Sequence, residues 1–118
     1  MAEAFTLAFD APLGSLNTLR VNATARCLAS ASVPDVLPAI LAHERPRALP
    51  VLVLGEGSNV LFAADFRGLV LRPAWRSVRI SEDDGRTAIV RAAAGYGWDA
   101  LVDWTLARNP GAVSVNAL

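Results

Sequence analysis

The order of apolar and polar positions predicts a strand and then a helix in the first half of the chain. Residues 25–31 mix small and apolar types, as strands do. Between residues 33 and 41, apolar side chains recur at helical spacing and would form one face of an amphipathic helix. Ser32 and Asp35 match a capping box with Asp in place of Glu, so the helix should begin there and fade before Pro46.

The second half of the chain predicts several strands and a second helix. Four segments have extended patterns: residues 51–54, 69–71, 76–80 and 87–94. The first of these is apolar throughout, which is typical of a strand buried on both faces. Apolar residues from Trp98 to Leu106 repeat at helical spacing, with Trp98 expected in the core, and residues 109–111 should end that helix.

The connections between these elements are expected to be loops and turns. Residues 1–22 are predicted to be loop-like, Asp65–Gly68 a polar turn, and Asp84-Gly85 the turn of a hairpin. The strands and helices do not alternate regularly, which counts against a doubly wound parallel sheet. The predicted class is therefore α+β, with residues 1–118 in one small domain.

Composition and charge exclude several classes of function. Eleven basic residues balance eleven acidic ones, so no electrostatic attraction to nucleic acid or an anionic membrane is expected. No apolar run approaches the roughly 20 residues that span a bilayer. Cys27 is the only cysteine and His43 the only histidine, and no spacing suggests a metal site. A cytoplasmic protein is the simplest expectation.

The segment Gly55-Glu56-Gly57-Ser58-Asn59 carries the candidate chemistry. It follows an apolar strand, and its glycines allow positive φ and a close approach of a ligand to the backbone. Consecutive N–H groups in such a loop can converge on an anion such as a pyrophosphate. A tight turn between two core strands explains the same residues equally well.

Two common phosphate-binding motifs do not match this loop. A P-loop needs a lysine, and the chain has none. A dinucleotide fingerprint of the Rossmann type needs a third glycine that opens a helix, but Val60 stands there and a β-like run follows. Ser58 lacks a nucleophile-elbow context and a histidine partner, so a hydrogen bond to phosphate is its expected role.

With its flanks, this loop resembles a known family. Val51–Phe62 is similar to the flavin-binding loop of the UDP-N-acetylenolpyruvoylglucosamine reductases, also called UDP-N-acetylmuramate dehydrogenases. Asn17-Thr18 stands where that family has Asn-Thr-Phe, and Asp65–Gly68 resembles its Asp-Tyr-Arg-Gly turn. Residues 90–98 are similar to its Ala-Gly-x-x-Trp segment. The resemblance covers about residues 16–111.

The resemblance implies a fold, a cofactor and a reaction. The fold would be the N-terminal portion of an FAD-binding domain of the p-cresol methylhydroxylase type. Residues 54–59 (Leu54, Gly55, Glu56, Gly57, Ser58 and Asn59) would bind the FAD pyrophosphate. The intact enzyme would be a monomer that uses NADPH, through FAD, to reduce UDP-N-acetylglucosamine enolpyruvate in peptidoglycan synthesis.

The chain departs from the family in informative places. Leu19-Arg20 replaces the usual Phe-Gly, and residues 111–118 resemble the family only loosely. The family's catalytic serine, arginine and glutamate, and its substrate domain, lie beyond the matching stretch, so no catalytic residue is expected here and the fragment should be inactive. Another flavoenzyme of the same fold, or a non-catalytic α+β domain, remains an alternative.

Overall fold

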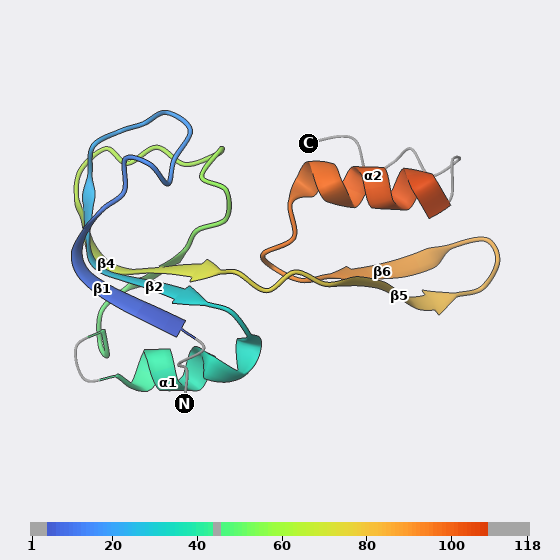
Figure 1. The fold of residues 1–118 in the computed structure, drawn as a ribbon, viewed down its shortest axis with the longest axis horizontal. Helices are drawn as coiled ribbons and strands as arrows, with labels where there is room; N and C mark the ends of the chain where they lie inside the picture. Colours follow the sequence, from blue (N-terminus) through green and yellow to red (C-terminus); the bar gives the residue numbers. More distant parts are fainter. Residues whose placement is uncertain (1–4, 44–45, 109–118) are drawn as a thin grey trace. The chain divides into compact units, whose positions relative to one another are not determined.

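The structure is a computed structural model, which describes residues 5–43 and 46–108. The chain divides into two compact units, residues 1–75 and 76–118. Figure 1 shows the elements of both units, coloured along the sequence. In order, they are β1 (Phe5–Pro12), β2 (Thr24–Ala31), a 3-10 turn η1 (Pro34–Val36), α1 (Leu37–Ala42), β3 (Val51–Val53), β4 (Phe66–Pro73), β5 (Val78–Asp83), β6 (Ala88–Ala92) and α2 (Trp98–Arg108). The predicted α+β class is confirmed. Within the described residues, no helix is long and apolar enough to cross a membrane.

The first unit is a four-stranded sheet in the order β1-β2-β4-β3. β1 is antiparallel to β2, whereas β2 and β3 both run parallel to β4. The helix between β2 and β3 is the kind of crossover that parallel strands require. The carboxyl ends of β2, β4 and β3 therefore lie at one edge of the sheet.

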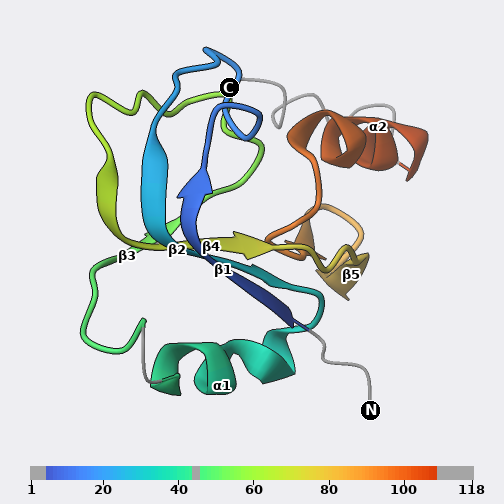
Figure 2. The same ribbon diagram turned by 60° about the vertical axis from the view of Figure 1, so that its left-hand side comes forward.

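Each face of this sheet has its own core. On one face, small residues of β2 and the apolar residues of β4 allow α1 to approach closely, and Ile40 of α1 is fully buried there. On the other face, Leu54, Val70 and Phe62 pack with Leu13. Figure 2 shows α1 on the first face and the loops 13–23 and 54–65 together on the opposite side.

The second unit consists of a hairpin, β5-β6, followed by α2. The predicted hairpin turn is confirmed: Gly85 has a φ of +85°, and the Asp84 carboxylate accepts hydrogen bonds from the N–H groups of Arg86 and Thr87. The second helix is also confirmed, but Trp98 is 39% exposed and the buried side chain of α2 is that of Thr105. The predicted stop at residues 109–111 lies outside the described residues.

Three local predictions were wrong. Residues 5–12 form β1 rather than a loop, because Phe5, Leu7 and Phe9 alternate with exposed residues and pack on the α1 side. The strand at residues 51–53 is an edge strand, so Val53 is 60% exposed rather than buried on both faces. Residues 66–68 belong to β4 instead of a turn.

The start of α1 also differs from the predicted capping box. The 3-10 turn η1 begins after Val33, and neither Val33 nor Val36 caps its helix with a side chain. Pro34 and the Pro at the start of α1 supply the helical φ instead.

Candidate functional site

The glycine-bearing loop lies directly after β3 and begins the connection to β4. Gly55, Glu56, Ser58 and Asn59 are exposed, whereas Gly57 is buried and has a φ of +73°. Leu54 is 1% exposed, with its side chain in the core, and its N–H donates to the Leu71 carbonyl of β4, so both are engaged within the sheet. As predicted, the loop has no helix behind it, but the β-like run expected from Val60 is not a strand, and the next strand, β4, begins only at Phe66.

Gly57 is the point where this loop meets an earlier part of the chain. The N–H of Thr18 donates to the Gly57 carbonyl at 3.1 Å, and the Thr18 hydroxyl lies 3.4 Å from the same oxygen. A Cβ on Gly57 would collide with the Leu16 carbonyl oxygen and would lie 2.8 Å from the Asn17 Cα. Glycine is therefore required here both for its φ and for the absence of a side chain.

Asn17 holds the segment that receives Gly57. Its side chain is 4% exposed and donates from Nδ2 to the carbonyls of Leu13 (2.8 Å) and Val21 (3.3 Å). Its Oδ1 accepts the N–H of Val21 at 2.9 Å. Both ends of the amide are satisfied, as a buried polar group requires. This side chain fixes the turn of residues 17–21, and through Thr18 it also positions the glycine loop.

The backbone donors of the glycine loop are unused within the described part of the chain. Among residues 5–43 and 46–108, none accepts a hydrogen bond from the N–H groups of residues 55–59. A Cβ added to Gly55 would have no atom beyond its chain neighbours within 4 Å, so the space beside its backbone is open. Free donors beside open space suit a phosphate group, whose oxygens accept several N–H bonds at once. The hydroxyl of Ser58 and the amide of Asn59 are exposed on the same loop and can add further bonds.

A cleft of about 380 Å³ lies beside this loop, lined by Gly14, Ser15, Asn17, Thr18, Arg20 and Glu56. Arg20 is held at a φ of +55°, in the left-handed region that a side chain disfavours. Hydrogen bonds to Asn17 hold the backbone on both sides of Arg20: the Arg20 N–H donates to the Asn17 carbonyl, and the Val21 N–H donates to the Asn17 Oδ1. The carboxylate of Glu56 would repel a phosphate and is better suited to accept a ligand hydroxyl.

The sequence predicted the loop but not the roles of Asn17 and Thr18, which hold it in place. Asn17 and Thr18 entered only through the resemblance, and the structure adds what they do: one braces the turn and the other bonds to Gly57. In the sequence, Arg20 differs from the glycine that the family has at this place. That departure was the available signal, because a glycine at that place points to a left-handed backbone.

The first unit is thus an α+β structure: a four-stranded sheet with one helix, and a glycine loop whose free backbone donors can bind an anion. No family model matches the chain. It is, however, similar to proteins named UDP-N-acetylenolpyruvoylglucosamine reductase. The relative from Xylella fastidiosa (strain M12) is 48% identical over 97 residues, which are 82% of this chain and 28% of that protein.

Two further relatives carry the same name. One from Pseudomonas fluorescens is 41% identical over 97 residues, and one from Xanthomonas oryzae pv. oryzae is 48% identical over 100 residues. The chain spans less than a third of the length of these relatives, 28% to 29%. The resemblance to these reductases is confirmed, as is the reading of the chain as matching only a part of them.

Proposed function

We propose that this chain is the flavin-binding part of a UDP-N-acetylenolpyruvoylglucosamine reductase. The name shared by the relatives supports the reductase, and the open donors of the glycine loop support the cofactor. In this proposal both units belong to one FAD-binding domain of the p-cresol methylhydroxylase type. The intact enzyme is a cytoplasmic monomer that acts on UDP-N-acetylglucosamine enolpyruvate in peptidoglycan synthesis.

The residues of the loop fit a dinucleotide pyrophosphate. The N–H groups of residues 55–59 would donate to its oxygens, Gly55 would allow it to approach the backbone, and Ser58 and Asn59 would add side-chain bonds. When bound, FAD would supply hydride transfer from NADPH to the substrate. The protein's part here is to hold and orient the cofactor. No catalytic residue is assigned to the chain.

The free backbone donors at Gly55 carry this proposal, and filling the space above them tests it. We expect the purified chain to bind FAD, measured by quenching of flavin fluorescence. Gly55→Val should abolish most of that binding without a loss of stability, because its side chain would enter open space. Ala63→Val, at another exposed position of the same connection, is the matched control and should bind normally. A wild-type chain without FAD affinity would contradict the proposal.

A further inference from the structure

Arg72 of β4 is a half-buried arginine that has no hydrogen-bond or ion-pair partner among the described residues. Its Nε is buried and has no hydrogen-bond acceptor. Within the part of the chain that the structure describes, no carboxylate pairs with its guanidinium. Burying an N–H of a charged group without an acceptor costs free energy. The position therefore suits an anion from outside the described residues.

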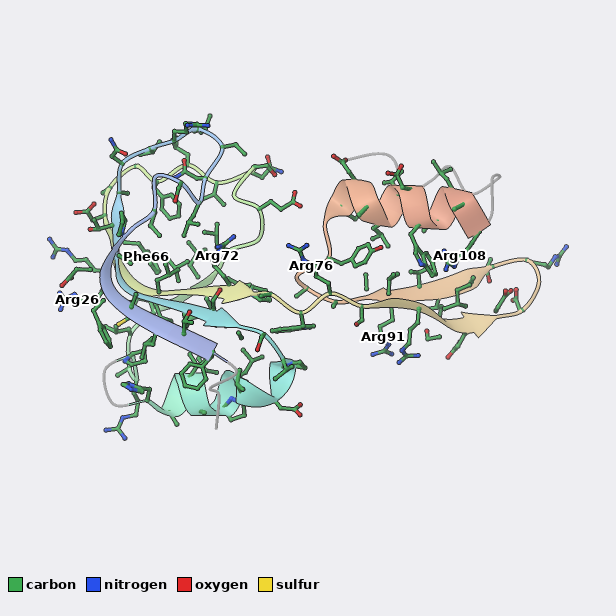
Figure 3. The ribbon with its side chains drawn as sticks, in the orientation of Figure 1. Arg26, Phe66, Arg72, Arg76, Arg91 and Arg108 are labelled. Carbon is green, nitrogen blue, oxygen red and sulfur yellow. The ribbon has the colours of Figure 1, made fainter. Side chains whose placement is uncertain are left out.

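The sheet register places Arg72 next to the start of the glycine loop. Val53 of β3 pairs with Leu71 of β4, and the N–H of Leu54 donates to the Leu71 carbonyl at 2.9 Å. Side chains alternate between the faces along a strand, so Arg72 shares the face of Val70. That is the face on which Leu54 is buried and over which the loops lie. In Figure 3, the side chain of Arg72 extends from β4 toward the side of these loops.

The edge at which Arg72 lies is the one where parallel sheets bind ligands. β2, β4 and β3 end there at Ala31, Pro73 and Val53. Ser30 of β2 pairs with Arg72 in the register and brings a hydroxyl to the same level. Ligands of open parallel sheets bind outside the carboxyl ends of the strands.

We propose that the Arg72 guanidinium binds a phosphate oxygen of the nucleotide held by the glycine loop; this inference rests on the proposed function. The backbone and side-chain donors of the loop are all neutral, and Glu56 brings a negative charge to it. A dianionic pyrophosphate needs a positive charge to offset both. Arginine suits this role because its planar fork donates two N–H bonds to one phosphate and stays charged.

The test compares Arg72→Met and Arg72→Lys with the wild-type chain, using FAD, riboflavin and inorganic pyrophosphate as probes. Methionine keeps the unbranched stem of the side chain as far as the ε position and removes the charge. Arg26→Met, at an exposed position near the amino end of β2, is the control with the same loss of charge. We expect Arg72→Met to weaken FAD binding about tenfold to hundredfold, the value of a charge-assisted bond. Riboflavin lacks phosphate, so its affinity for Arg72→Met should equal its affinity for the wild-type chain.

Failure of this inference is distinguishable from failure of the proposed function. If the wild-type chain binds FAD and Arg72→Met binds it equally well, Arg72 does not bind phosphate and the proposed function stands. If the wild-type chain does not bind FAD, the proposed function fails, and titration with pyrophosphate decides whether Arg72 and the loop still form an anion site. In the wild-type chain, pyrophosphate should then shift the NMR signals of the Arg72 Nε–H and of the Gly55 amide; a weaker shift of the Gly55 amide in Arg72→Met would support the anion site alone. Absence of any shift in the wild-type chain would overturn it.

Discussion

The close contact between Gly57 and the Leu16–Asn17 backbone predicts how much stability the chain loses when Gly57 gains a side chain. Replacing Gly57 with alanine forces a Cβ onto a residue with a φ of +73° and into the space of the Leu16 carbonyl and the Asn17 Cα. The left-handed conformation costs a side chain about 1–2 kcal/mol. Overpacking adds about 1–3 kcal/mol, and the smaller entropy of the unfolded chain returns less than about 1 kcal/mol. We expect Gly57→Ala to lower the free energy of unfolding by about 2–4 kcal/mol.

Urea denaturation followed by circular dichroism measures this loss, and two other glycines separate its causes. Gly55→Ala has neither a left-handed φ nor a neighbour within 4 Å, so its stability should change by less than about 0.5 kcal/mol. Gly85→Ala has a φ of +85° but open space, and should cost the hairpin only about 1 kcal/mol. If Gly57→Ala costs no more than Gly85→Ala, the steric part of the argument is refuted.

Two further predictions concern Arg20 and Asp84. Arg20→Gly should stabilise the chain by about 0.5–1 kcal/mol, because glycine removes the strain at φ +55° and loses part of that gain to unfolded-state entropy; Arg20→Ala keeps the Cβ and should bring no such gain in the same urea experiment. Hydrogen bonds from the N–H groups of Thr87 and Arg86 hold the pKa of Asp84 below its usual value of 3.8. The hairpin should therefore keep this stabilising contribution above pH 3.8 and lose it as the pH falls through the lower, folded-state pKa. An NMR titration of the Asp84 carboxyl with a midpoint at or above 3.8 would contradict this.

Local pattern was enough to predict most elements of the fold, but not their neighbours. Residues 25–31, the hairpin and α2 follow from alternation, turn chemistry and helical spacing. The apolar run at 51–53 gave no sign of an edge position, because strand order in a sheet is decided by contacts between distant segments. β1 has a clear alternation from Phe5 to Phe9, but the proline and glycine that follow are typical of a loop and favoured that prediction for the whole segment.

The candidate site was predictable where chemistry is local and unpredictable where it depends on packing. The glycine spacing and the resemblance identified residues 54–59. They did not show that Gly57 is buried against Asn17, or that Leu54 faces the core. Arg72 carries no motif at all. Its significance comes from the register that sets it beside Leu54, and from a buried Nε without an acceptor.

The hydrogen bond between Thr18 and Gly57 also has a consequence for folding kinetics. These residues are 39 positions apart, and the bond from the Thr24 N–H to the Asp65 carboxylate at 2.9 Å spans 41. Contacts so distant in sequence form late, because loop closure must precede them. During synthesis the Thr18 segment must wait for Gly57 to leave the ribosome before the loop has its support. No short peptide cut from this region should reproduce the loop, and ligand binding should appear only after the sheet has formed.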